Sequence, residues 1–203
     1  MIRADIHPTK RALLESAREL TEIHGVDNLT VDMVLTHSKV SKGSLYHHFE
    51  DFDSLIHEVQ LRKFSEFVEE GINFLEQAFG MASNAEQLRA NLHAISALAN
   101  SRARGPLRIE RARIFGMSGT NLSFNHALAK EQERLRQRGE DLVAEAQSRG
   151  WVNTSLSARA LSSFILGFTF GRVLDDVCET HVNSDEWNEV VRQFLDRVLL
   201  TSL

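Results

Sequence analysis

Cysteine is nearly absent from this sequence, since Cys178 is the only one among 203 residues. A lone cysteine forms no internal disulfide, so a chain of this length must be stabilised by a hydrophobic core. The sequence also lacks an uninterrupted apolar run of about 18 residues, and no apolar stretch follows its charged first residues. We therefore expect a cytoplasmic protein with no membrane span and no signal peptide.

Positive charge is also in short supply, because the whole chain carries a formal net charge of −5. Residues 1–54 hold six Lys and Arg against nine Asp and Glu, which leaves −3, together with five histidines. This balance argues against a protein that coats nucleic acid by bulk electrostatic attraction. Any contact with DNA has to come from where a few basic groups are placed.

Proline and strand-like alternation are scarce as well, since Pro8 and Pro106 are the only prolines. Apolar residues instead recur every three or four positions, which predicts an all-α protein. Pro8 and Thr9 open a first helix that ends at Gly25, and a loop is expected at residues 25–30. The apolar face of this helix consists of Leu13, Leu14, Ala17, Leu20, Thr21 and Ile23.

Two short helices separated by a tight turn are predicted between residues 30 and 49. Thr30 has the chemistry of an N-cap for the first helix, which ends near His37. The turn follows at residues 38–40, and Ser41 is the N-cap of the second helix. Helices this short are not stable alone, so the second must dock on the two helices before it.

The second short helix has one apolar and one polar side. Leu45 and Phe49 are four residues apart, which turns both inward. The residues that then face outward are Lys42, Gly43, Tyr46 and His47, flanked by Ser44 and His48. This arrangement describes a helix-turn-helix, whose second helix enters a major groove. The alternative is a helical hairpin whose polar residues merely face water.

The outward residues suit contact with DNA. Gly43 lets the helix backbone approach base edges, and Lys42 reaches a phosphate or a guanine edge. Tyr46 and His47 are donors to phosphate oxygens. The full set of predicted DNA-binding residues is Thr30, Lys39, Ser41, Lys42, Gly43, Ser44, Tyr46, His47 and His48.

Residues 11–56, RALLESARELTEIHGVDNLTVDMVLTHSKVSKGSLYHHFEDFDSLI, resemble the N-terminal DNA-binding domain of the tetracycline-repressor (TetR) family of bacterial transcription regulators. The resemblance implies a three-helix DNA-binding domain, which we place at residues 1–52. It also implies a larger helical domain for ligand binding and dimerisation, at residues 53–203. Members of the family usually repress transcription until a small molecule binds.

Two residues depart from the usual pattern of the family. Lys39 stands in the turn where glycine is common, so the turn either holds Lys39 at positive φ or takes another geometry. Phe52 stands where a lysine is common at the start of the fourth helix, which puts the phosphate contact of that lysine in doubt. Asp51 and Asp53 suit a helix N-terminus but must turn away from DNA phosphates.

Beyond residue 55 the sequence predicts long helices. Their apolar positions recur every three or four residues at Phe64, Val68, Ile72, Leu75, Phe79, Leu88, Leu92, Ile95 and Ala99. The resemblance suggests that aromatic residues here line a ligand cavity, whereas plain core packing explains the same spacing. The residues that we assign to a ligand pocket are Phe67, Phe74, His93, Phe115, Phe124 and Phe168.

Residues 101–113, SRARGPLRIERAR, are the one strongly basic stretch, and Pro106 divides it between two helices. Its arginines suit an anionic ligand or a phosphate. The alternative, which we favour, is a solvated run of charges that pairs with acidic neighbours.

A helix over residues 156–181 is apolar nearly all round and carries a seam for a partner helix. The last helix, expected to start with Ser184 as its N-cap, is also more widely apolar than one contact needs. As the resemblance also implies, two such helices suit the four-helix interface of a twofold dimer. The residues assigned to this interface are Phe164, Gly167, Gly171, Leu174, Cys178, Trp187, Val191, Phe194 and Val198.

Catalytic motifs are missing: the sequence has no Gly-rich phosphate loop, nucleophile elbow or HExxH. Asp175, Cys178 and His181 are ligand-capable types at helical spacing, but the seam explains two of them. We therefore expect no enzyme, no metal and no cofactor. The predicted function is a homodimeric repressor that a small-molecule ligand releases from a palindromic double-stranded DNA operator. The alternative is a ligand-independent DNA-binding or nucleoid-associated protein of the same fold, with no void around the six pocket residues.

Overall fold

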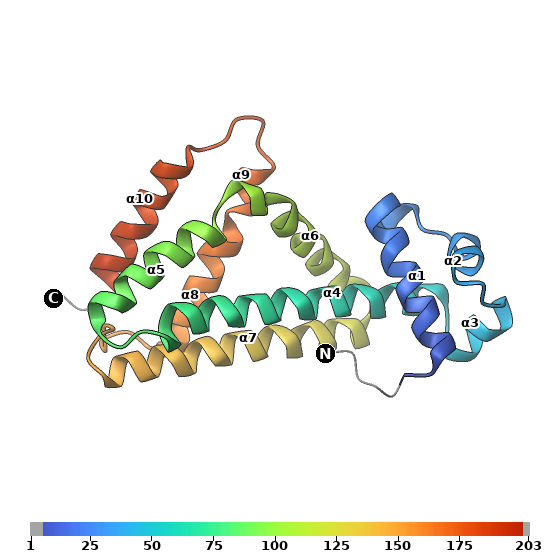
Figure 1. Ribbon diagram of the computed structural model, residues 1–203, viewed down its shortest axis with the longest axis horizontal. Coiled ribbons are helices and arrows are strands. Elements are labelled where there is room, and N and C mark those ends of the chain that lie inside the picture. The colour runs from blue at the N-terminus through green and yellow to red at the C-terminus, as the bar shows by residue number, and fades with distance from the viewer. Residues whose placement is uncertain (1–5, 201–203) are drawn as a thin grey trace. The chain divides into compact units, whose positions relative to one another are not determined.

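The computed structural model describes residues 6–200, and the chain divides into two compact units between Lys63 and Phe64 (Figure 1). The helices that begin in the first unit are α1 (Pro8–His24), α2 (Val31–Ser38), α3 (Lys42–His48) and α4 (Phe52–Leu75), and α4 continues into the second. A 3-10 turn, η1 (Val26–Asn28), lies where the sequence predicted a loop.

The helix ends of the first unit are the predicted ones. Pro8 opens α1, and Gly25 ends it with φ of +79°. The Thr30 hydroxyl accepts the backbone N–H of Met33 at 3.3 Å and caps α2. The Ser41 hydroxyl accepts the backbone N–H of Ser44 at 3.2 Å and caps α3. Each cap satisfies a donor that the first turn of a helix leaves without a partner.

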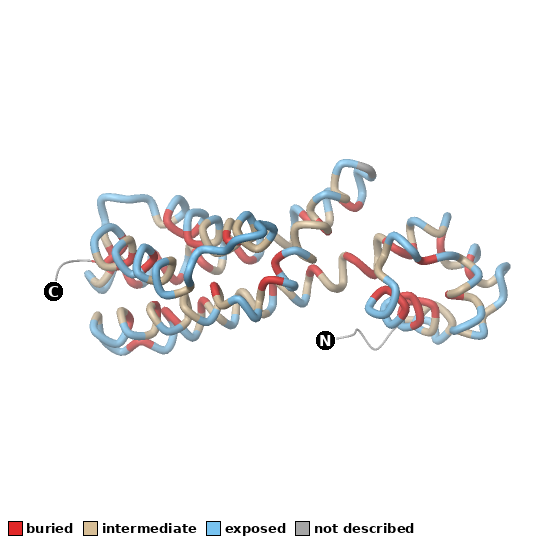
Figure 2. Tube along the Cα trace, turned by 90° about the horizontal axis from the view of Figure 1, so that it is seen from above, coloured by how far each residue is buried: buried red, intermediate tan, exposed pale blue. Residues whose placement is uncertain are grey.

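The core of the first unit forms where these helices meet. Its completely buried side chains are Leu13, Ala17, Val34, Leu45 and Leu55. Buried positions recur at intervals along the helices, as the apolar spacing predicted (Figure 2). Ile23 was expected on the same face but is 69% exposed. That prediction was wrong because Ile23 lies at the edge of the helical face that Leu13 and Leu20 define.

The second unit adds α5 (Ala85–Ala99), α6 (Gly105–Gly116), α7 (Leu122–Ser148), α8 (Ala158–Gly171), α9 (Val173–Asp176) and α10 (Ser184–Phe194). Short 3-10 or π turns accompany them at η2 (Glu76–Gly80), η3 (Arg102–Arg104), η4 (Met117–Thr120) and η5 (Leu195–Leu199). Within residues 6–200 the only β-structure is a bridge between Val152 and Leu200, so the all-α prediction is confirmed.

Two glycines let α7 pack closely on its neighbours. Gly71 of α4 lies against Leu135 of α7, and these two helices run side by side (Figure 1). Gly139 of α7 faces Ser162 of α8, where an added Cβ would come within 2.4 Å of the serine hydroxyl. That hydroxyl is buried and donates to the Arg136 carbonyl at 3.0 Å. The approach of α7 and α8 therefore depends on glycine at position 139.

The predicted helix over residues 156–181 is broken into α8 and α9 at Arg172. Arg172 is 1% exposed, and its guanidinium lies 4.6 Å from the centre of the Trp187 ring. Burial lowers the pKa of Arg172, while the charge of Asp175 opposes that shift. The expected seam does not continue to Cys178 and His181, because α9 ends at Asp176.

The start of α10 also differs from the prediction by one residue. Asn183, not Ser184, is the N-cap, because the Asn183 side chain accepts the backbone N–H of Asp185 at 2.7 Å. No helix in residues 6–200 combines the length and apolar character needed to cross a membrane.

We predict that Gly139→Ala lowers the free energy of unfolding by about 1–3 kcal/mol, because the new methyl group forces the Ser162 hydroxyl off the Arg136 carbonyl. Urea unfolding of the full chain measures this loss. Gly116→Ala is the matched control, since no atom lies within 4 Å of its Cβ position. Ser162→Ala combined with Gly139→Ala should lose less than the two single losses added together. Strictly additive losses would contradict the proposed clash.

Candidate DNA-binding surface and ligand cavity

The outward face of α3 is open to solvent. Lys42 and His47 are exposed, and Tyr46 is 45% exposed. No atom lies within 4 Å of the position where Gly43 would carry a Cβ. Leu45 and Phe49 are buried on the opposite side. The structure therefore brings the predicted groups of α3 together on one exposed strip of backbone and polar side chains.

The turn before α3 holds Lys39 at positive φ, which was one of the two geometries expected from the sequence. Lys39 ends α2 in the left-handed conformation, with φ of 57° and ψ of 27°. This conformation is uncommon for a side chain with a Cβ and costs of order 1 kcal/mol. The Lys39 side chain is exposed beside the N-terminus of α3. The turn thus adds a cation next to the strip that Gly43 and Lys42 form.

Asp51 is directed at its own helix. Its carboxylate accepts the backbone N–H of Ser54 at 2.7 Å and the Ser54 hydroxyl at 2.6 Å. These hydrogen bonds, the side-chain one first, lower the pKa of Asp51. The carboxylate therefore stabilises the first turn of α4, in the way that an N-terminal carboxylate does.

Three histidine rings, those of His7, His47 and His48, lie together at α3, and the place of His7 was not predicted from the sequence. His7 and His48 have ring centres 4.9 Å apart, and His47 and His48 have centres 5.2 Å apart. Lys10 lies 5.0 Å from the centre of the Phe49 ring and pairs with Glu58 at 2.7 Å. Partial burial, followed by the charges of His7, His47 and Lys10, lowers the pKa of His48.

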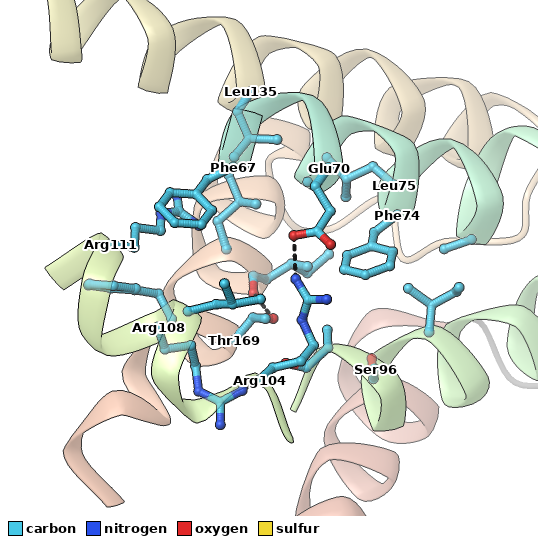
Figure 3. A pocket seen from close by; sticks show the side chains of 18 of the residues that line it. Phe67, Glu70, Phe74, Leu75, Ser96, Arg104, Arg108, Arg111, Leu135 and Thr169 are labelled. Carbon is cyan, nitrogen blue, oxygen red and sulfur yellow. Dashed lines mark hydrogen bonds and ion pairs between the residues drawn. The ribbon is translucent and has the colours of Figure 1, made fainter. Parts of the chain in front are cut away.

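The second unit contains a cavity of about 120 Å³ between α4, α5, α6, α7 and α8 (Figure 3). Its apolar wall includes Phe67, Phe74, Leu107, Leu135 and Ile165. Figure 3 shows Arg104 reaching Glu70 beside the Phe74 ring, and the two form an ion pair. The site is mostly apolar with a few charged groups, as small-molecule pockets are.

Two of the six predicted pocket residues, Phe67 and Phe74, line this cavity, and the other four lie outside its lining. His93 instead lies 3.0 Å from the Asp196 carboxylate, and Phe124 is buried at the start of α7. Phe115 packs edge-on against Phe64 and Phe170, with centres 5.0 and 5.4 Å away. Phe168 packs near Phe164 and Phe194. The helical spacing in the sequence predicts that these side chains lie on apolar faces, but it does not determine which helix packs against each face.

The basic stretch supplies the polar lining that the prediction missed. Arg104, Arg108 and Arg111 all line the cavity. Their spacing by four and three residues, which puts them on one helical face, was the available signal. Pairing with acidic neighbours is found, since Arg108 Nε lies 2.6 Å from Asp176. The expectation of a solvated run was wrong, because Arg108 is only 7% exposed.

The residues assigned to a dimer interface fall into two groups. Phe164 and Leu174 are 53% and 74% exposed, Val198 is 39% exposed, and Gly167 and Cys178 are exposed as well. Phe194 is half-buried and stacks on Phe164 with ring centres 4.7 Å apart, and Gly171 is half-buried too. Val191 lies in the core of its own unit, and Trp187 is covered by Arg172. Among the described residues no three His, Cys, Asp or Glu side chains are grouped to hold a metal.

We predict that His48→Gln makes the protein less sensitive to acid. The pKa of His48 is lower in the folded than in the unfolded chain, so the unfolded chain binds more protons between the two pKa values. Acidification from pH about 7.5 to 5.5 therefore favours unfolding of the wild type, and the substitution removes this contribution. Melting temperatures across that range measure it. His24→Gln, at the other end of α1, is the control, and an equal effect there would contradict the assignment.

Comparisons with known proteins find similarity along the whole chain. Residues 13–59 match the family described as bacterial regulatory proteins, tetR family. The transcriptional regulator UidR of Escherichia coli K12 is 22% identical over 99% of this chain and 98% of its own. A transcriptional regulator of Saccharomonospora viridis in complex with choline has the same fold, with a TM-score of 0.67 and 14% identity over 95% of this chain and 98% of that one. GusR of Salmonella enterica gives a TM-score of 0.63 and 18% identity over 97% and 98%.

The family match covers α2 and α3 and parts of α1 and α4, and the sequence match to UidR extends over nearly the whole chain. With its capped helix-turn-helix and mainly helical second unit, the chain is similar to the TetR family of helix-turn-helix transcription regulators, whose model matches its residues 13–59.

Proposed function

We propose that this chain is a homodimeric, cytoplasmic repressor that leaves a palindromic DNA operator when a small molecule enters its cavity. In this proposal residues 1–52 bind DNA, and residues 53–203 bind the ligand and dimerise. The observation that carries the DNA-binding part is the open strip of α3 around Gly43. The family consists of transcription regulators, which in general are not enzymes.

The residues of the strip offer two kinds of contact to DNA. Gly43 admits the groove edge to the helix backbone, while Lys42 and Lys39 provide cations for base edges or phosphates. The Ser41 and Ser44 hydroxyls lie 2.9 Å apart at the start of α3. Further phosphate donors are Thr30, Tyr46, His47 and His48. With so few lysines, affinity depends on placing each donor on a phosphate and less on surplus charge.

Dimerisation is supported by apolar surface on the last helices. Phe164 and Leu174 are more than half exposed, and so are Val177 and Val190 at 68% and 70%. Large apolar side chains that stay exposed on a single chain are candidates for burial in a protein interface. Gly167 is exposed and has no atom within 4 Å of its Cβ position, so a partner helix can approach closely there. A twofold interface would then set the spacing of the two α3 helices.

Release by a ligand follows from linkage. A ligand that binds better to a dimer with the wrong α3 spacing lowers operator affinity by its differential affinity. The cavity lined by Phe67 and Phe74 of α4 favours this over the ligand-independent alternative, which needs no void. The similar regulator of Saccharomonospora viridis is in complex with a small molecule, choline, which also supports ligand binding by this fold.

We predict that Gly43→Phe abolishes sequence-specific DNA binding while the protein stays folded and dimeric. The new side chain occupies the open space that a groove edge needs. Selection of binding sites from a random library, followed by gel-shift titration, measures the effect. Gly43→Ala adds one carbon and should cost less than Gly43→Phe. A footprint with one unrepeated half-site would contradict the palindrome and the dimer.

We also predict that Tyr46→Phe weakens binding to all DNA sequences alike, by about 1 kcal/mol if one phosphate hydrogen bond is lost. The hydroxyl is removed while the ring on α3 remains. Titrations against the selected operator and against unrelated DNA at fixed salt give the comparison. A change in base preference would instead place Tyr46 in the groove, contrary to the proposal.

A further inference from the structure

The three arginines of the cavity differ in how their charges are balanced. Arg104 pairs with Glu70, which also lines the cavity. Arg108 donates two hydrogen bonds to the Asp176 carboxylate, of 2.6 and 2.8 Å. Arg111 has no carboxylate within ion-pair distance in the described part of the chain. The cavity wall therefore carries one guanidinium charge without an anion.

Arg111 is surrounded by groups that do not neutralise it. Its guanidinium carbon lies 5.7 Å from the ring centres of Phe64 and Phe115 and 5.4 Å from that of Phe170. One amino group donates to the Gln132 amide oxygen at 3.0 Å. Its Nε is shielded from water and has no hydrogen-bond partner. Aromatic faces attract a cation, but more weakly than a carboxylate at hydrogen-bond distance does.

The unfavourable surroundings of the Arg111 charge are reflected in the pKa of this side chain. Burial lowers the pKa of Arg111 to about 10, and no neighbouring carboxylate counters the shift. Arg111 therefore remains charged at neutral pH in surroundings that disfavour charge. An anion that enters beside it would recover interaction energy that the free protein lacks.

The other lining residues of the cavity limit the size and polarity of the molecule that carries the anionic group. Phe67, Phe74, Leu107 and Ile165 give apolar walls, and Figure 3 shows Arg111 beside Phe67. The volume of about 120 Å³ is close to that of cavities that hold one benzene ring. A ligand cation would meet three guanidinium groups and only one lining carboxylate, that of Glu70, which Arg104 already engages.

We propose that the cavity binds a small apolar carboxylate of about one ring, with its carboxylate on Arg111 and its ring against Phe67 and Phe74. This inference rests on the proposed function only in taking the cavity as the ligand site. The unpartnered Nε of Arg111 leaves part of its planar guanidinium fork available to donate to a carboxylate.

The test compares benzoate with benzamide, which has the same shape and no charge. Isothermal titration of the full chain should give tighter binding of benzoate, by on the order of tenfold or more. Arg111→Gln should remove that preference, whereas Arg111→Lys should keep part of it and guards against a folding failure of the first variant. Arg113→Gln is the matched control, because Arg113 pairs with Glu110 and does not line the cavity.

The outcomes separate the ligand class from the regulatory function. Equal binding of benzoate and benzamide, binding of neither, or an undiminished preference in Arg111→Gln would each overturn the inference. Those results would leave the operator titrations unaffected, so DNA binding is tested separately from the ligand class. If benzoate binds through Arg111 but leaves operator affinity unchanged, the inference holds and release by this ligand fails.

Discussion

The ion pair between Arg108 and Asp176 ties together the segments that make the larger unit. Both side chains are less than 10% exposed, and Arg108 also donates to the carbonyls of Ala99 and Ser101 at 2.9 and 3.1 Å. One guanidinium thus joins the end of α5, the start of α6 and the end of α9. Removing either partner would leave an uncompensated buried charge, which costs about 3–5 kcal/mol in proteins.

The helical face formed by Arg104, the N-cap residue of α6, together with Arg108 and Arg111 of α6 meets three different surroundings. Arg104 lies at the cavity with Glu70, Arg108 is held by Asp176, and Arg111 lies among aromatic rings. Leu174, on α9 two residues before Asp176, is 74% exposed. A single helix face therefore connects the cavity to apolar surface on the outside of the unit.

The first unit could be predicted in detail because its signals are local. The caps at Thr30 and Ser41 act on residues three positions ahead, and the inward and outward faces of α3 follow from helical geometry alone. The left-handed Lys39 was one of two open possibilities, because its conformation depends on how α2 and α3 dock.

The second unit was harder because its deciding contacts join distant residues. Arg108 and Asp176 are 68 positions apart, and nothing near either residue marks the other. The apolar run that suggested one helix over residues 156–181 contains no proline. The helix is nevertheless interrupted at Arg172, whose side chain is buried over Trp187, and it stops at Asp176. Spacing identified aromatic residues as buried, but only the packing of several helices determines which of them surround a void.

The stacking of Arg172 on Trp187 also allows the larger unit to be followed by tryptophan fluorescence. The chain has two tryptophans, and both lie under guanidinium groups, since Arg149 is 4.9 Å from the centre of the Trp151 ring. The one tyrosine, Tyr46, is on α3. Fluorescence excited at the red edge of the tryptophan band therefore comes from the larger unit alone. Because Trp187 follows the segment that Asp176 anchors, its emission reports movement of that segment with no added label.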